Sequence, residues 1–159
     1  MKVLLHICCA PCAIYPLKAL REEGFEVMGF FYNRNIHPYQ ECLRREETVK
    51  RYAKQQGLKV IYQEGYDIEN FLQNVAFREQ QRCQYCYHDR LKATAMVARH
   101  GKFDYFTSTL LQSKHQQHER IKIIGKCLAK SLGVPFYYQD FREGWQEGME
   151  ESKRMDMYR

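Results

Sequence analysis

The sequence lacks the segments that would insert a protein into a membrane or export it. No apolar run approaches the ~20 residues that a membrane-spanning helix needs. The N-terminus has neither the basic region nor the cleavage site of a secretory signal peptide. We therefore expect a cytoplasmic protein that has no membrane partner.

The sequence also lacks two motifs that bind nucleotide phosphates. Neither G-x-G-x-x-G nor G-x-x-x-x-G-K-[ST] occurs in the 159 residues. A nucleotide cofactor held by such a loop is therefore not expected, and a sulfur transferase that uses ATP on tRNA is disfavoured. The sequence shows no internal repeat, low-complexity stretch or domain boundary, so we expect one α/β domain over 1–159, with a polar tail from about residue 140.

What is present is a globular composition with a moderate excess of positive charge. Charged residues make up 28% of the chain and aromatic residues 14%, which excludes a disordered protein. The formal charge of +6 is compatible with a nucleic-acid partner but does not by itself indicate one.

Strand-like and helix-like segments alternate along most of the chain. The strands are expected at 2–7, 25–32, 58–62, 104–109 and 134–138. The helices are expected at about 11–24, 39–56, 68–75, 87–100 and 117–132. This alternation predicts a parallel five-stranded sheet with helices on both faces. In such sheets ligands bind beyond the carboxyl ends of the strands, where HICCAPC, NRNIHP and TSTLLQSKHQ would meet.

The cysteines are the clearest chemical signal. Cys8, Cys9 and Cys12 form C-C-x-x-C, and Cys83 and Cys86 form C-x-x-C. In a reducing compartment such thiols indicate metal binding or catalysis rather than a disulfide framework. The first cluster precedes a helix, whose N-terminus favours thiolates. Two distant clusters predict a shared metal centre, although thiolates do not choose between zinc and iron. One buried thiol with incidental neighbours, or a redox C-x-x-C working alone, stays open.

Other polar residues are weaker candidates. Asp89 follows Cys86 by three residues, so on a helix it could be an oxygen ligand, and a solvated carboxylate explains it equally well. His37 in NIHP could donate a proton or be an ordinary loop residue. His115 and His118 could share a metal, although a surface pair is the commoner explanation.

A basic face for RNA phosphates is a further possibility, and a merely solvated surface explains the same residues equally well. His6, just before the cysteines, is as compatible with a core position as with a functional one. The basic residues are Arg34, Arg44, Arg45, Lys114, Arg120, Lys122, Lys153, Arg154 and Arg159.

Several stretches together resemble the QueH family of epoxyqueuosine reductases. They are LLHICCAPC, NIHPYQECLRR, RCQYCYHDRL, FTSTLLQSKHQ, DFREG and SKRMDMYR. The combination of C-C-A-P-C with R-C-x-x-C-Y-x-x-R-L is specific, and the similarity extends along nearly the whole chain. The family is similar in fold to adenine-nucleotide alpha-hydrolase-like α/β proteins. Its pattern continues after M-Y-R into Y-C-G-C, whereas this sequence stops at Arg159.

The resemblance implies a cobalamin-independent oxidoreductase that converts epoxyqueuosine at the tRNA wobble position to queuosine. It implies a 4Fe–4S cluster, one additional mononuclear iron and an external electron donor. The residues expected to hold the cluster are Cys8, Cys9, Cys83 and Cys86. Those expected to act in catalysis are Cys12, Asp89 and His37, with Asp89 also a metal ligand. The alternatives are a zinc-binding module that binds RNA and a thiol–disulfide oxidoreductase that uses Cys9 and Cys12.

Overall fold

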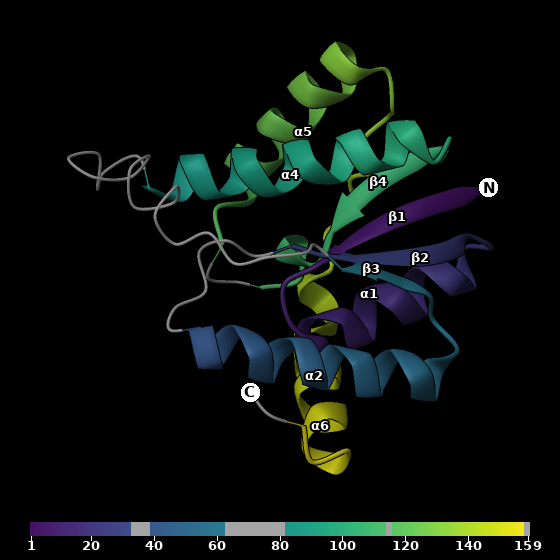
Figure 1. The fold of residues 1–159 in the computed structure, drawn as a ribbon, viewed down its shortest axis with the longest axis vertical. Coiled ribbons are helices and arrows are strands. Elements are labelled where there is room, and N and C mark those ends of the chain that lie inside the picture. Colours follow the sequence, from purple (N-terminus) through teal and green to yellow (C-terminus); the bar gives the residue numbers. More distant parts are fainter. Residues whose placement is uncertain (33–38, 63–81, 114–115, 158–159) are drawn as a thin grey trace.

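The computed structural model describes residues 1–32, 39–62, 82–113 and 116–157, without the side chains at 39, 42 and 82–86. A parallel sheet lies at its centre, with the strand order β3-β2-β1-β4 (Figure 1). The strands are β1 (Lys2–Ile7), β2 (Glu26–Phe31), β3 (Val60–Tyr62) and β4 (Tyr105–Ser108). The expected α/β architecture is confirmed.

The expected fifth strand at 134–138 is reduced to a single bridge. Phe136 pairs in parallel with Phe106 of β4, through hydrogen bonds from Phe106 N–H to Pro135 and from Tyr137 N–H to Phe106. Pro135 has no N–H to extend the ladder, so this segment lies beside β4 without forming a full strand. The predicted number of five strands is therefore wrong by one. The segment predicted as the fifth strand does pair with the sheet, at Phe136 alone.

The helices cover the sheet in two layers (Figure 1). One face holds α1 (Ala10–Glu22), α2 (Tyr39–Gln56) and α6 (Trp145–Arg154). The other face holds α4 (Arg82–His100) and α5 (His118–Leu132). The segment expected as a polar tail contains α6, which packs against α1. The expected helix at 68–75 lies outside the described residues.

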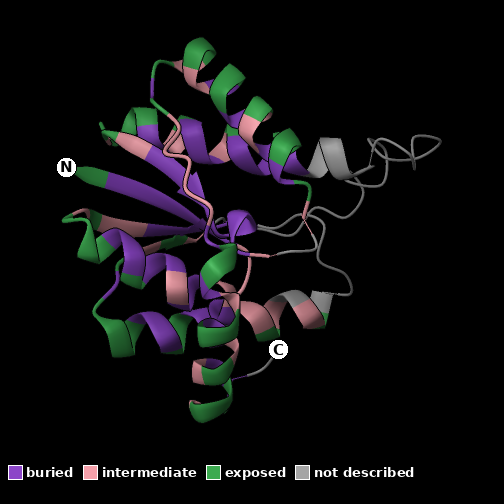
Figure 2. Ribbon diagram, turned by 180° about the vertical axis from the view of Figure 1, so that it is seen from behind, coloured by how far each residue is buried: buried purple, intermediate pink, exposed green. Residues whose placement is uncertain are grey.

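The core surrounds β1, one of the two strands with a neighbour on each side. Val3, Leu4 and Leu5 have no exposed surface, and Figure 2 shows the buried strands between the two helical layers. Strands covered on both faces read as continuous apolar runs, which explains VLLHI. No helix in the described part of the chain is long and apolar enough to cross a membrane.

The topology fixes where a site should lie. The chain leaves β1 through α1 on one face and reaches β4 through α4 on the other, so the connection changes face between β1 and β4. Ligands of open α/β sheets bind beyond the strand ends at such a point. His6 and Ser108 are paired in the register there, one residue before the end of β1 and at the end of β4.

Candidate metal centre

Three thiols gather directly beyond the end of β1. Cys8 follows the strand, Cys9 is the extended residue that precedes α1 (φ −162°, ψ 161°), and Pro11 lies in the first turn. Cys12 then comes one turn into the helix and points back to the strand end. The Cys8 and Cys9 Sγ atoms are 3.9 Å apart, the Cys9 and Cys12 Sγ atoms are 2.9 Å apart, and all three lie within 4.8 Å of one another.

Thr109 holds the first of these thiols across the point where the connection changes face. The backbone N–H of Cys8 donates a hydrogen bond to Thr109 Oγ1 (3.1 Å), and the Thr109 hydroxyl donates one to Cys8 Sγ (3.3 Å). Thr109 is fully buried and begins the short 3-10 turn Thr109–Leu111 after β4. The two neighbouring strand ends are therefore tied together at the cysteine cluster.

The close packing separates the pKa values of the three thiols. Hydrogen bonds shared with Cys12 and Cys9 hold the pKa of Cys8 well below its ordinary value, and the Thr109 hydroxyl adds to the effect. The pKa of Cys12 is well above its ordinary value because of its contacts with Cys8 and Cys9 and because of burial. The pKa of Cys9 is also raised: its bond to Cys12 opposes the shift, whereas Cys8 and burial outweigh it. One thiolate forms easily, and it opposes ionisation of the other two.

This arrangement fits a bound metal ion or cluster. Metal binding replaces thiol protons, so a cation would relieve the repulsion that keeps Cys9 and Cys12 protonated. Tetrahedral thiolates on one ion lie about 3.8 Å apart, because the metal–sulfur bond is about 2.3 Å long. The Cys8–Cys9 separation agrees with that value, and the shorter Cys9–Cys12 contact would open on binding. The three cysteines are the group in the described residues whose donors could hold one ion.

His6 is a core residue that ties the strands together. Its side chain is fully buried, and Nε2 donates to the carbonyl oxygen of Tyr32, because a carbonyl can only accept (2.9 Å). Nδ1 then accepts from the Ser108 hydroxyl (2.9 Å), which itself accepts from the N–H of Leu110. Burial, assisted by the Arg90 charge, lowers the pKa of His6 to about 4. The ring is therefore neutral, and both of its nitrogens are used in the fold.

Asp89 reaches the same edge of the sheet through Tyr32. Tyr32 follows β2, and its hydroxyl donates to Asp89 Oδ1 (3.1 Å) from across the sheet end. Asp89 is half-buried on α4. It does not belong to the group of possible metal ligands that lie within 4.8 Å of one another, which consists of the three cysteines. Its role as an iron ligand stays a prediction.

The other predicted ligands cannot be placed by their side chains. Cys83 and Cys86 lie in the first two turns of α4, and their side chains are outside the described part of the structure. His37 and His115 lie outside the described residues altogether. His118 is buried at the start of α5, so the expected surface pair is wrong for this residue.

Two arginines have charges that act on the cysteines, and the sequence alone did not place either of them at this site. Arg90 of α4 is buried, and its charge contributes to lowering the pKa of Cys8. Arg45 of α2 is bonded to Glu41, and the charges of Cys9 and Cys8 act on it. Thr109 was missed as well. The sequence feature that could have indicated Thr109 is a residue with a hydroxyl group directly after a strand. This pattern is common, so it becomes informative only when the order of the strands in the sheet is known.

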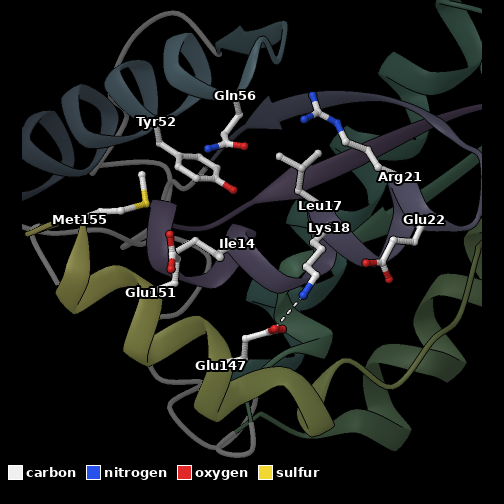
Figure 3. Close-up of a pocket in the computed structure, with 10 residues that line it drawn as sticks. All are labelled: Ile14, Leu17, Lys18, Arg21, Glu22, Tyr52, Gln56, Glu147, Glu151 and Met155. Carbon is white, nitrogen blue, oxygen red and sulfur yellow. Dashed lines mark hydrogen bonds and ion pairs between the residues drawn. The ribbon is translucent and has the colours of Figure 1, made fainter.

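A separate cavity of about 470 Å³ lies between α1, α2 and α6 (Figure 3). The residues of α1 that line it all follow Cys12 in the sequence. From α2, Tyr52 points its hydroxyl into the space between Leu17 and Ile14. An ion pair between Lys18 and Glu147 (2.7 Å) closes one side. The cysteines do not line this cavity, so it is distinct from the metal centre.

Comparison with known proteins identifies the family. The profile described as "Epoxyqueuosine reductase QueH" matches residues 3–159. The chain belongs to the QueH family. QueH of Dehalococcoides mccartyi is 36% identical over 158 residues, which cover 99% of this chain and 87% of the relative. QueH of Thermotoga maritima is 35% identical over 167 residues, with 99% and 84% covered.

Solved structures confirm the fold of this QueH family member. The predicted subunit of a tRNA methyltransferase from Methanocaldococcus jannaschii matches with a TM-score of 0.62 at 13% identity, over 96% of this chain and 74% of the other. The U34-tRNA thiolase NcsA from Methanococcus maripaludis, described with its [4Fe-4S] cluster, matches with a TM-score of 0.53 at 12% identity, over 98% and 67%. At these identities the likeness shows the fold alone.

Proposed function

We propose that this chain is an epoxyqueuosine reductase that works by iron–sulfur chemistry without cobalamin. The family assignment supports the reaction, since relatives with that name match nearly the whole chain. The epoxide of epoxyqueuosine takes up two electrons and two protons, its oxygen leaves as water, and the carbon–carbon double bond of queuosine remains. The observation that supports iron–sulfur chemistry most directly is the packing of Cys8, Cys9 and Cys12 within 4.8 Å at the strand end.

The proposed cluster ligands are Cys8, Cys9, Cys83 and Cys86. A further iron would be held close by, with Cys12 and Asp89 as the proposed groups around it. When bound, these irons would supply single electrons from an external donor and a Lewis acid for the epoxide oxygen. The start of α4 supports this assignment, because Tyr32 already ties Asp89 of that helix to the edge where β1 and β2 end.

The described side chains prepare the site in specific ways. Thr109 fixes Cys8 through both its backbone and its sulfur, so the first ligand cannot turn away. The Tyr32 hydroxyl orients the Asp89 carboxylate, and it is a donor that could pass on a proton. His37 is the proposed proton donor among the residues that lie outside the described structure. The cysteines are half-buried, which limits the access of water to them.

The proposed partner is a tRNA with epoxyqueuosine in its anticodon loop. Bases in such loops can be turned out of the stack into a pocket, and the charge of +6 favours phosphate binding. The electron donor would be a separate cytoplasmic reductant.

The test is anaerobic purification of the wild type, Cys9→Ser and Cys127→Ser. We expect Cys9→Ser to lose iron, sulfide and visible absorption, and to form no queuosine as detected by mass spectrometry of digested tRNA. Cys127 is an exposed cysteine of α5, so Cys127→Ser is the matched control and keeps all four properties. Full iron content and turnover in Cys9→Ser would defeat the assignment of the cluster.

A second candidate function is thiol–disulfide exchange, because the Cys9 and Cys12 sulfurs are only 2.9 Å apart. In that reaction both thiols would be oxidised to a disulfide while a substrate disulfide is reduced. Metal-free reduced protein would then reduce a small aromatic disulfide in repeated cycles with a thiol reductant, and Cys12→Ser would stop it. Iron-dependent turnover of tRNA without this activity would exclude the alternative. Colourless protein with stoichiometric zinc would instead support an RNA-binding zinc module.

A further inference from the structure

Two guanidinium groups act on the cysteine cluster from opposite faces of the sheet. Arg90 comes from α4, and its charge is one of the factors that lower the pKa of Cys8. Arg45 comes from α2 on the other face, where burial opposes a rise in its pKa but the bond to Glu41 and the charges of Cys9 and Cys8 outweigh it. Both arginines are therefore close enough to the sulfurs for their charges to interact.

The two arginines differ in exposure. Arg90 is 8% exposed, so a large substrate cannot reach it without unpacking the helix. The Arg45 side chain is 36% exposed. Arg45 lies in the second turn of α2, and this end of the helix is on the side of the sheet where the strands end (Figure 1). Of these two cations, Arg45 is the one that a macromolecule can reach.

Arg45 is also held in place with its terminal groups available. Its Nε donates to Glu41 Oε1 (3.1 Å), one turn earlier on α2, and the Glu41 carboxylate is 24% exposed. The bond uses Nε alone. Within the described residues, the terminal N–H groups of Arg45 make no other hydrogen bond. A side chain that is fixed at Nε loses less entropy when its terminal groups bind a ligand.

We infer that Arg45 binds a backbone phosphate of the anticodon loop, next to the nucleotide whose base enters the cysteine site. This inference rests on the proposed function, because it takes RNA as the substrate. A base turned out of its loop leaves its flanking phosphates on the outside of the site, within reach of an exposed cation such as Arg45. A guanidinium matches the geometry of a phosphate through paired N–H donors. Arg45 is thus a substrate-binding residue, whereas Arg90 is a buried counter-charge.

The experiment compares Arg45→Gln with Arg51→Gln. Arg51 is exposed on the same helix, six residues further on and so about 9 Å along the axis from Arg45. Both variants lose one positive charge, so an effect of net charge alone would weaken RNA binding equally in the two. The measurements are the affinity for an unmodified anticodon stem-loop RNA at several salt concentrations, KM and kcat for modified tRNA, and iron and sulfide content.

We expect Arg45→Gln to weaken RNA binding and raise KM about tenfold, the scale of one charge-assisted hydrogen-bonded contact. The plot of log affinity against log salt should become shallower by about 0.7, the value for one contact to a single strand. The content of iron and sulfide and kcat should stay as in the wild type. Arg45→Lys should recover part of the affinity, and Arg51→Gln should change it less than twofold.

Equal effects of Arg45→Gln and Arg51→Gln on binding would overturn the inference. Loss of iron with unchanged RNA affinity would also overturn it, and would make Arg45 a second counter-charge. Wild-type protein that binds the RNA through Arg45 but never reduces epoxyqueuosine would leave the inference standing and refute the proposed reaction. Wild-type protein that does not bind the RNA would refute both.

Discussion

Cys8 and Thr109 are joined twice, although 101 residues separate them in the sequence. The Cys8 N–H donates to the Thr109 hydroxyl oxygen, and the hydroxyl donates to the Cys8 sulfur. One small side chain therefore satisfies a backbone group at the end of β1 and stabilises the Cys8 thiolate at the same time. The edge of the sheet where β1 and β4 end depends on this contact.

Thr109→Val keeps the shape of the side chain and removes its hydroxyl. We expect the free energy of unfolding to fall by about 1–3 kcal/mol, because the buried Thr109 hydroxyl no longer accepts from the Cys8 N–H. Thr109→Ser retains the hydroxyl and is the control. Urea unfolding of the metal-free proteins measures the difference, and equal midpoints for the wild type and Thr109→Val would show that the contact contributes nothing to stability.

Two buried histidines allow a matched comparison. Both ring nitrogens of His6 have well-formed hydrogen bonds, whereas the buried ring nitrogens of His118 make, in the described part of the chain, no more than a weak contact with the backbone of Ser113. His6→Leu should therefore lower the free energy of unfolding by about 2–4 kcal/mol, since the Tyr32 carbonyl and the Ser108 hydroxyl each lose a partner. His118→Leu should cost far less. Denaturant unfolding at pH 7.5 compares them, and similar losses would contradict this account.

The same His118 predicts a dependence of stability on pH. Burial, assisted by the Arg142 charge, lowers the pKa of His118 in the folded protein below 6.5, against the opposing effect of Asp140. The unfolded chain then binds the proton more readily. The contribution of the neutral His118 ring to the free energy of unfolding is therefore complete above about pH 6.5. It is lost as the pH falls towards the pKa of His118 in the folded protein. His118→Leu should therefore lose less stability than the wild type between pH 7 and pH 5 in urea titrations. Parallel pH profiles would refute the lowered pKa.

Local patterns predicted the elements whose residues carry their own signals. The expected bounds of β1 and α2 agree with the structure, because an apolar run and a helical repeat of apolar residues define them. The C-C-x-x-C cluster was placed at the correct edge by the strand–helix alternation alone. The role of Thr109 could not be predicted, since it arises from a contact between segments that are distant in the sequence. Arg45 was predicted only as one of several basic residues, and its relation to the cysteines needed the arrangement of the helices. The bridge at Phe136 shows a β-favouring segment that Pro135 keeps from extending.

The charged segment after residue 140 is held against α1 by a glycine that a local pattern does not reveal. A Cβ added to Gly144 would overlap Cγ of the Tyr15 ring, whereas one added to Gly148 would lie 3.4 Å from the Gln112 amide nitrogen. Gly144→Ala should therefore displace α6 and lower the free energy of unfolding by about 1–3 kcal/mol, the usual cost of overpacking. Gly148→Ala, inside α6, should be neutral or stabilising because alanine favours helix. Thermal unfolding of both variants tests this, and an undisturbed melting temperature in Gly144→Ala would mean that Tyr15 can move aside freely.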